Sequence, residues 1–365
     1  MKAIGRLVVR FSFIALALLV AAPAAPQSVA KVDPRALAMG GGYVAVADGW
    51  AALQWNPAGM WVSGRNEAAV TAGDVPLEAG PWIESLRVAA GRSSVLDPAR
   101  AAATLSSSES GLVGERTFGA YVISPRFGGG FQQISYVNEG DTQPLGEILL
   151  DQAALRTREV LFSVAQPLAQ GRVALGASAK IVQAQGRYQR SALAGITLSG
   201  LSARALLADA RAAPTVAEKT VFAVDVGVLV MASAKVRIGG VVKNLNAPTL
   251  DAQAPIVMRL PRQVRVGGLF LPHPRLKLTL DLDLIADSFI EGLRNRRELG
   301  GGVQWGGEVV ALRGGMFVDL DAVERGTTYT FGFGVNGKVL RVDAGASWAP
   351  DYDGFGWIGA LAAEF

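Results

Sequence analysis

The chain has 365 residues, half of them hydrophobic, and it contains no cysteine. Disulfides, thiolate metal sites and a lipid anchor on an N-terminal cysteine are therefore excluded. The formal net charge is +4, but residues 1–30 hold three of the 35 basic residues and no acidic one, so the rest is nearly neutral. This balance gives no electrostatic reason to expect a nucleic-acid partner.

The N-terminus has the features of a secretory signal peptide. Three basic residues precede an apolar run at 11–22, and small residues and prolines follow it. This run is shorter than the roughly 20 residues that a membrane helix requires. We expect 1–30 to be the signal peptide, with cleavage after Ala30 preferred over cleavage after Ala24.

The next segment, 34–60, combines small residues with turn-forming ones. It contains the motifs Arg35-Ala-x-x-Met-Gly-Gly, Ala45-x-Ala-Asp and Asn56-Pro-Ala-Gly. Asparagine is a good N-cap and proline suits the first helical position, so the third motif predicts the start of a short helix or turn. The glycines of the first motif allow positive φ and a close approach to another backbone.

This segment resembles the N-terminal hatch of the outer-membrane long-chain fatty-acid transporter (FadL-like) superfamily, and is most similar to its PorV/PorQ-type and TraF-like branches. A second piece, Leu260-Pro-x-x-x-Arg265-x-Gly after Lys243-Asn-Leu, is similar to a strand pair of the PorV-like branch. The resemblance implies a 14-stranded barrel whose N-terminal segment folds into the lumen as a plug. Gly42 stands where the family more often has alanine.

The candidate hatch residues are the glycines, the acidic residue and the Asn-Pro-Ala-Gly stretch of this segment. For the acidic one, two interpretations stay open: an ion pair with a lumen cation (Arg265, Arg341 or Lys277), or a solvated turn. The spacing Gly-x-Gly-x-x-Ala at 40–45 also fits a loose dinucleotide fingerprint, but no βαβ unit surrounds it. The predicted hatch residues are Gly40, Gly41, Gly42, Asp48, Asn56, Pro57, Ala58 and Gly59.

From residue 117 onward the chain alternates with period two. In 275–284, five leucines face one way while Arg, Lys, Thr and two Asp face the other. One apolar and one mixed polar face are typical of a barrel strand between lipid and a polar lumen. We predict an all-β fold, a transmembrane antiparallel β-barrel of about 14 strands with an N-terminal plug. The predicted strands are 83–91, 117–124, 129–138, 157–167, 172–187, 219–232, 235–245, 260–271, 275–285, 296–305, 308–319, 327–335, 338–348 and 355–365.

Short and long connections alternate between these strands, as short periplasmic turns and long extracellular loops do in outer-membrane barrels. Residues 67–75 also look like a strand, but they would make the number odd, so we assign them to the plug. The predicted organisation is therefore a signal peptide at 1–30, a hatch at 31–80 and a barrel at 81–365.

The last strand ends in an aromatic row. Phe355, Trp357, Leu361 and Phe365 share one side of an extended strand, and the chain stops on the last of them. This ending is typical of the closing strand of an outer-membrane barrel, with an aromatic side chain at the membrane interface.

Candidate catalytic chemistry is sparse. His273, the single histidine, lies between two prolines in a predicted periplasmic turn, far from any nucleophile that it would need to activate. Acids such as Asp281, Asp283 and Asp343 fit lumen-facing positions, where they would pair with basic groups. No cluster has metal-ligand spacing. We expect no enzyme activity, no cofactor and no metal.

The predicted extracellular loops are rich in apolar residues. The stretch 200–213 is able to form a helix, and 145–155 suits a short amphipathic helix. Three interpretations stay open: a landing groove for a hydrophobic ligand, a protein-docking surface, or helices packed on one another. The candidate ligand or partner surface consists of Leu193, Ile196, Leu198, Leu201, Leu206 and Leu207.

These observations predict a protein of the bacterial outer membrane that moves a hydrophobic compound across it. The alternative is a PorV-like secretion or assembly component that binds exported proteins, and a third possibility is a purely structural barrel. The expected partners are outer-membrane lipids, the barrel assembly machinery, and either a hydrophobic small molecule or a secreted or periplasmic protein, with no nucleic acid.

Overall fold

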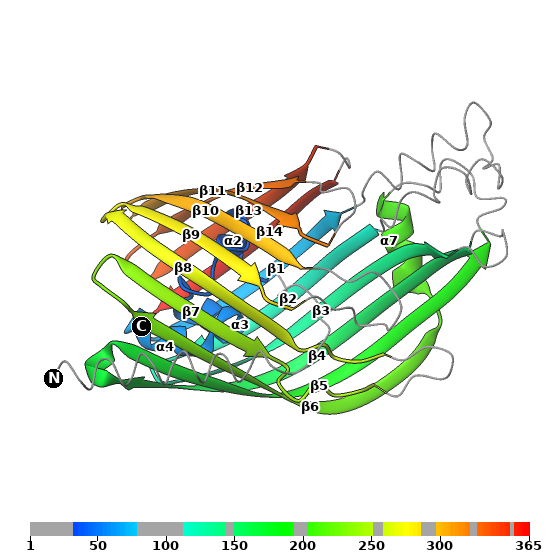
Figure 1. The fold of residues 1–365 in the computed structure, drawn as a ribbon, viewed down its shortest axis with the longest axis horizontal. Helices are drawn as coiled ribbons and strands as arrows, with labels where there is room; N and C mark the ends of the chain where they lie inside the picture. Colours follow the sequence, from blue (N-terminus) through cyan, green and yellow to red (C-terminus); the bar gives the residue numbers. More distant parts are fainter. Residues whose placement is uncertain are drawn as a thin grey trace.

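The computed structural model forms one closed antiparallel barrel around an N-terminal segment (Figure 1). Within the part of the chain that it describes, fourteen strands pair in sequence order, and β1 pairs with β14 to complete the ring. The predicted fold class is therefore confirmed. The described residues are 32–78, 112–142, 149–192, 203–250, 258–285, 297–307, 309–321, 327–350 and 354–365. The predicted signal peptide lies outside them.

The strands differ in length around the ring. β3 to β6 have 16 to 20 residues each, whereas β7 to β14 have 8 to 11. One part of the wall is thus taller than the rest. The strands are β1 (Glu67–Glu78), β2 (Leu112–Ile123), β3 (Phe127–Thr142), β4 (Leu149–Leu168), β5 (Val173–Ala192), β6 (Thr215–Met231), β7 (Val236–Lys243), β8 (Gln263–His273), β9 (Leu276–Asp283), β10 (Glu298–Gly306), β11 (Val310–Asp319), β12 (Thr327–Asn336), β13 (Leu340–Ala349) and β14 (Gly354–Glu364).

The first strand is not the predicted one. Residues 67–78 pair with β14 on one side and with β2 on the other, so they belong to the wall. Our assignment of 67–75 to the plug, and with it the boundary at residue 80, was wrong. This placement depends on backbone pairing with β14 and β2, which alternation within the segment does not indicate. The predicted strand 83–91 lies outside the described residues.

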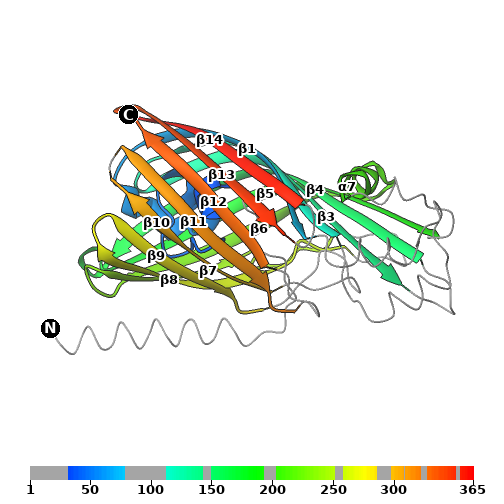
Figure 2. The ribbon, with the colours of Figure 1, turned by 90° about the horizontal axis from the view of Figure 1, so that it is seen from above.

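The two ends of the barrel differ as predicted. The short turns and the C-terminus lie at one end, here called the turn end, and the strand ends that flank the longer connections lie at the other, the loop end (Figures 1 and 2). Helix α7 (Ala203–Ala212) stands at the loop end and confirms the helix expected over 200–213. The helix expected over 145–155 is wrong, because its described part, 149–155, belongs to β4.

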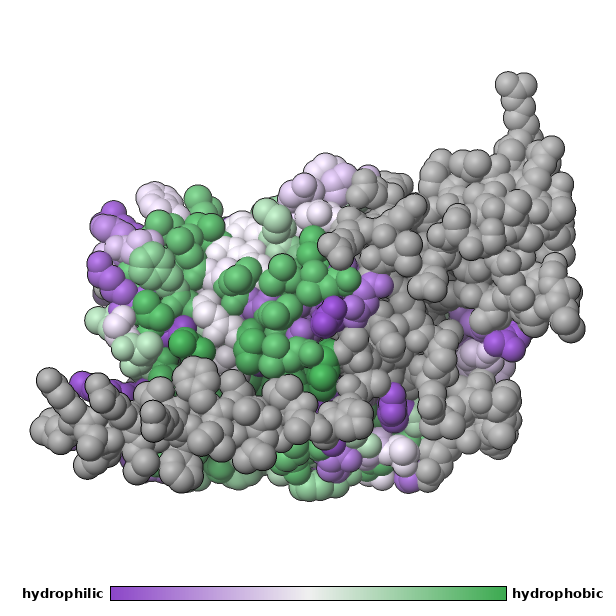
Figure 3. Space-filling model, in the orientation of Figure 1, coloured by the Kyte–Doolittle hydropathy of each residue, from purple (hydrophilic) through white to green (hydrophobic). Residues whose placement is uncertain are grey.

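The outer surface of the wall is apolar. Phe162 in β4, Leu280 in β9 and Trp357 in β14 are each more than half exposed, whereas their chain neighbours Ser163 and Asp281 point inward and are buried. Figure 3 shows hydrophobic side chains gathered over the strands of the turn-end half. Such a belt is what lipid contact requires of a barrel. No helix among the described residues has the length and apolar character needed to cross a membrane.

The N-terminal segment 32–66, here called the hatch, lies in the lumen toward the turn end (Figure 1). From Val32 to Met60 every residue is buried except Asp48, which is partly exposed. The hatch consists of short helical turns: α2 (Pro34–Ala38), η1 (Gly49–Ala51), α3 (Ala52–Trp55), η2 (Pro57–Gly59) and α4 (Met60–Ser63).

Candidate functional site

The hatch crosses the lumen from wall to wall. Its first helix, α2, packs on β11 to β14, whereas η2 packs on β4 to β6. These two groups of strands lie on opposite sides of the fourteen-strand ring. The hatch is therefore held at both ends, and the lumen around it is filled by an apolar cluster that includes Trp50, Trp55 and Met60.

Pairs of glycines on adjacent strands receive the hatch backbone, and we call them glycine seats. Gly176 in β5 and Gly227 in β6 are directly opposite each other, and a Cβ at either would collide with η2 or its cap. A second pair, Gly302 and Gly315, lies against Met39. Because a side chain at these positions has no room, the absence of a Cβ sets how closely the hatch approaches the wall.

A third seat lies under α2. Gly332 in β12 pairs with Gly345 in β13. A Cβ at Gly332 would lie 2.6 Å from the Cβ of Ala38, and one at Gly345 would collide with the carbonyl of Pro34. Both ends of the hatch thus rest on glycine pairs, a feature that we did not predict. Its signal in the sequence is glycine at inward-facing strand positions.

Asn56 links two parts of the hatch to each other and to the barrel wall. Its Oδ1 accepts a hydrogen bond from the Ala58 backbone nitrogen at 3.2 Å, and Pro57 begins η2, so the predicted N-cap is confirmed. Its Nδ2 donates to the carbonyl of Val44 at 3.1 Å and to that of Val228 in β6 at 3.0 Å. One side chain therefore uses both its acceptor and its donor in the buried site.

Further polar contacts fix the middle of the hatch. Asp281 in β9 accepts from the backbone nitrogens of Tyr43 and Val44, each at 2.7 Å. Thr330 in β12 accepts from the nitrogen of Gly40 at 3.0 Å. Arg265 in β8 donates to the carbonyl of Gly41 at 3.2 Å. These bonds satisfy hatch backbone groups that would otherwise be buried without partners.

Asp48 pairs within the hatch. Its Oδ1 lies 2.9 Å from a guanidinium nitrogen of Arg35, which also contacts Asp33 at 3.0 Å. Burial opposes its charge, but the nearby cations, Arg35 first among them, together outweigh burial and lower the pKa of Asp48 to about 2. The predicted ion pair is therefore present, but its cation is Arg35 of the hatch and none of the three named wall cations.

Two of those three cations are paired with wall acids instead. Arg265 contacts Asp283 at 2.5 Å and Glu298 at 3.2 Å. Arg341 contacts Glu67 at 3.3 Å. Acids on the neighbouring strands are therefore already placed to compensate these basic groups.

The remaining predicted hatch residues act through the backbone. Gly40 and Gly41 have φ of 62° and 74°, in the left-handed region that favours glycine. Gly42 instead approaches the wall, since a Cβ there would lie 2.7 Å from Oγ1 of Thr279. Ala58 lies in the seat of β5, and Gly59 has no room for a side chain because the carbonyl of Ala47 lies against it.

The connection between β7 and β8 folds into the lumen at the tall side of the wall. We call 244–262 the inner loop; its described parts are 244–250 and 258–262. Its two arms are joined by a hydrogen bond from the Leu250 nitrogen to the Met258 carbonyl at 2.9 Å. Leu250, Met258 and Leu260 are at most 3% exposed.

Beneath the inner loop, four neighbouring strands present apolar side chains to the lumen. Ile134 in β3, Leu155 in β4, Val182 in β5 and Ala217 in β6 form one buried cluster with the three inner-loop residues. Tyr136 belongs to the same cluster. Lumen-facing positions of a water-filled barrel are usually polar, so this apolar lining is unusual for such a wall.

Lys180, Asp225 and Asn244 form a charged layer at the base of the inner loop. The ammonium group of Lys180 in β5 lies 2.8 Å from Asp225 and 2.7 Å from Oδ1 of Asn244. Asn244 also donates to the carbonyl of Pro261 at 2.8 Å. Because Asn244 and Pro261 belong to the two arms of the inner loop, this network pins the loop where it leaves the wall.

The predicted ligand or partner surface stays a prediction, because its side chains are not described. Leu193, Ile196, Leu198 and Leu201 lie outside the described residues, and Leu206 and Leu207 lie on α7. The apolar lining under the inner loop was missed. Its signal is the apolar residues at inward positions of β3 to β6, where the rest of the wall has charges and glycines.

The metal-ligand types and the single histidine can be located among the described residues. Those residues contain no group of three or more His, Cys, Asp or Glu residues that would hold a metal ion. His273 lies at the exposed end of β8, where its Nδ1 accepts from the backbone nitrogen of Arg275 at 3.2 Å. That contact agrees with the predicted turn.

Solved structures with the same fold exist. The toluene transporter TbuX of Ralstonia pickettii has a TM-score of 0.54 at 14% identity, over 91% of this chain and 98% of its own. The CymD monoaromatic hydrocarbon channel has 0.56 at 11%, over 93% and 98%. The P. putida toluene transporter TodX has 0.53 at 11%, over 93% and 99%. At such identities the likeness shows the fold alone, and that fold agrees with the 14-stranded barrel that the hatch motif implied.

Sequence comparison gives a family but no curated relative. No curated protein matches this chain. The closer resemblance to the PorV/PorQ branch stays a prediction. Residues 101–283 match the family model described as "F plasmid transfer operon, TraF, protein", a match that lies outside the hatch motif at 34–60. Because this match spans half of the chain, the protein belongs to that TraF family.

Proposed function

We propose that this protein lies in the bacterial outer membrane and moves a hydrophobic compound across it. The observation that carries the proposal is the apolar lumen lining under the inner loop. An apolar solute gains free energy on leaving water for such a lining, at about 25 cal/mol per Å² of buried apolar surface. Water and ions gain nothing there. The toluene and hydrocarbon channels that share the fold give the proposal independent support.

In this proposal the solute replaces the side chains of the inner loop. Leu250, Met258 and Leu260 already cover the lining, so a solute of similar character exchanges one apolar contact for another. It then meets the charged layer and the hatch, and passage to the turn end requires the hatch to shift.

A reversible lock on the hatch tests this route. Gly42 lies in the hatch and Thr279 in β9, and a Cβ on the first would lie 2.7 Å from Oγ1 of the second. That separation is within the reach of a disulfide after substitution by Gly42→Cys and Thr279→Cys. The native chain has no cysteine, so only the designed bond would form.

The measurement is uptake of labelled toluene and labelled oleate by a deletion strain that carries each variant. We expect uptake with the wild type, a severalfold loss with the oxidised lock, and recovery when a reductant opens it. The single variant Thr279→Cys is the matched control. Uptake that is the same with and without the gene, for both probes, would overturn the proposed function.

A second candidate function is a secretion or assembly component that binds exported proteins. The observation in its favour is the family model, whose description refers to a plasmid transfer operon. Chemical cross-linking in native outer membranes distinguishes the two. A stoichiometric exported partner, together with unchanged uptake of both probes, would favour this candidate over transport.

A further inference from the structure

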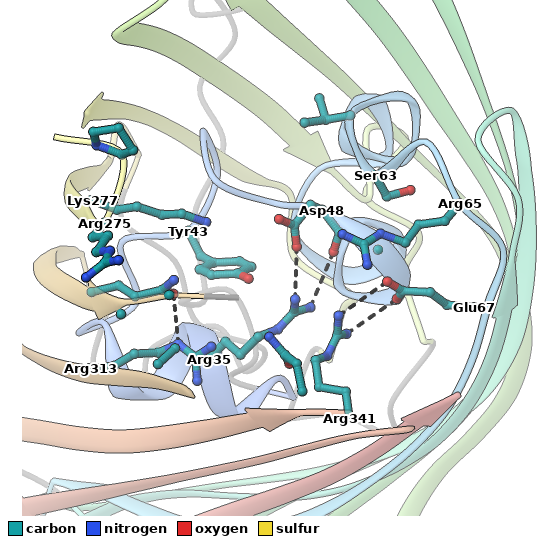
Figure 4. A pocket seen from close by; sticks show the side chains of 18 residues that line it. Arg35, Tyr43, Asp48, Ser63, Arg65, Glu67, Arg275, Lys277, Arg313 and Arg341 are labelled. Carbon is teal, nitrogen blue, oxygen red and sulfur yellow. Dashed lines mark hydrogen bonds and ion pairs between the residues drawn. The ribbon is translucent and has the colours of Figure 1, made fainter. Parts of the chain in front are cut away.

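A polar cavity of about 650 Å³ opens at the turn end of the barrel. It lies between the hatch and the ends of β9 to β13 (Figure 4). Residues of the short turns, such as Pro274 and Gly307, form its rim. The cavity is separate from the apolar lining under the inner loop and lies at the end to which the proposed solute would pass.

The side chains around the cavity are predominantly basic. Six basic residues and two acidic ones line it. Four of the basic groups are compensated: Arg35 by Asp48, Arg341 by Glu67, Arg313 by Asp343 and Arg65 by Glu364. The two others are Arg275 and Lys277 on β9 and the turn before it. Among the described residues neither makes an ion pair.

Arg275 and Lys277, the two basic groups without an ion pair among the described residues, face the same cavity. Both side chains line the cavity, Lys277 from β9 and Arg275 from the turn before it. Figure 4 shows them at one side of the cavity, with Tyr43 of the hatch next to Lys277. Arg275 is exposed near the rim, whereas Lys277 is only partly exposed and lies farther in.

Tyr43 adds a neutral donor from the hatch. The residue is 2% exposed, and its hydroxyl makes no hydrogen bond within the described part of the chain. Burial raises the pKa of this phenol well above its ordinary value, so it keeps its proton at any physiological pH. Tyr43 lines the cavity, so its hydroxyl can donate a hydrogen bond to a bound acceptor.

We propose that this cavity binds a small organic anion through a carboxylate or phosphate group held between Arg275 and Lys277. The arginine offers a planar pair of donors and the lysine a compact charge, which together match an oxyanion. Because one wall of the cavity belongs to the hatch and the other to the barrel, the bound anion bridges the two. Occupancy therefore stabilises the seated hatch.

Isothermal titration calorimetry of the detergent-purified protein tests this site. The probes are succinate and inorganic phosphate, with uncharged succinamide as a control and sodium chloride holding the ionic strength constant. Succinate binding would identify a carboxylate source, and phosphate binding a phosphate ester or headgroup. Either result supports the proposal. Absence of binding of both anions to the wild type would overturn it.

Variants then locate the site. We expect Lys277→Gln and, separately, Arg275→Gln to weaken binding at least tenfold. Arg275→Gln alters an exposed side chain without an ion pair, so it tests the site even if the deeper variant folds poorly. Lys235→Gln is the matched control, since Lys235 is exposed in the turn between β6 and β7. Equal affinity in all three variants and the wild type would overturn the proposal.

The unfolding temperature tests whether the bound anion bridges the hatch and the barrel wall. A ligand that binds only the folded, seated state raises the unfolding temperature by mass action. The anion that binds should therefore raise the unfolding temperature of the wild type and of Lys235→Gln, but not that of Lys277→Gln. This outcome does not depend on the transport proposal, because no hydrophobic solute takes part in the measurement.

Discussion

Asn56 of the hatch donates a hydrogen bond from Nδ2 to the carbonyl oxygen of Val228 in β6, 3.0 Å away. The same amide holds Val44 and caps η2, so one side chain ties two parts of the hatch to the wall. Asn56 therefore anchors the hatch on this side of the barrel, together with the glycine seat and the hydrogen bonds of Gln54 to β3 and of Ala45 to β7.

Replacing both Asn56 and Pro57 by alanine should loosen the plug. The change removes the three hydrogen bonds of Asn56 and leaves a buried carbonyl without its donor, at a cost of about 1–3 kcal/mol. We expect a higher ion conductance in planar bilayers while the barrel stays folded. Asn66→Ala is the control. Unchanged conductance of the double variant would mean that these two residues do not seal the lumen.

A methyl group in a glycine seat should displace the hatch. The variant Gly176→Ala places a Cβ against the backbone of Ala58, which has no room for it. We expect raised conductance and faster proteolysis of 32–66. Gly268→Ala, in β8, is the matched control, because a Cβ there meets nothing within 4 Å. If the two alanine variants behave alike, the seats do not position the hatch.

The inner loop should open when its apolar side chains are shortened. Met258→Ala combined with Leu260→Ala removes buried side chains, and each such truncation costs about 2–5 kcal/mol. Hydrogen exchange should then lose protection at the amides of Leu250 and Leu260, which bond across the loop. Thr249→Ala, at an exposed position of the same loop, should leave protection intact. Retained protection in the double variant would mean that these two side chains do not hold the inner loop over the apolar lining.

The buried basic group of β8 should matter far more than an exposed one. Arg265→Met leaves the carboxylates of Asp283 and Glu298 buried without their cation, and we expect a loss of about 3–5 kcal/mol in the free energy of unfolding by urea. Arg65→Met removes an ion pair to Glu364 in which Arg65 is 58% exposed, and should cost less than about 1 kcal/mol. Similar losses in both variants would refute this difference.

Much of the wall was predictable because its physics is local. A strand between lipid and lumen must alternate, so thirteen of the predicted strands correspond to β2 to β14 with shifted ends. The motif around Asn56 was readable for the same reason, since an N-cap acts on residues two positions away. The aromatic row of β14 is also exposed as predicted, with Phe355 and Trp357 more than half exposed.

The rest depends on residues far apart in the chain. The place of Glu67–Glu78 follows from pairing with β14, and the partner of Asp48 from the fold of the hatch. Likewise, the glycine of β5 at position 176 is required only because η2 lies across the lumen. Sequence alternation cannot identify a partner across a barrel, so these features became visible only in three dimensions.

The junction between β1 and β14 has a consequence for assembly. Glu67 pairs with Glu364, so the two ends of the wall meet only when the last strand has been made. The hatch precedes β1 directly, and it occupies the space that this junction encloses. The order of the chain therefore places the hatch before the wall that encloses it, and ring closure must take place around the hatch. Contacts between such distant parts of a chain form slowly, which gives the hatch time to settle while the sheet is still open between β1 and β14.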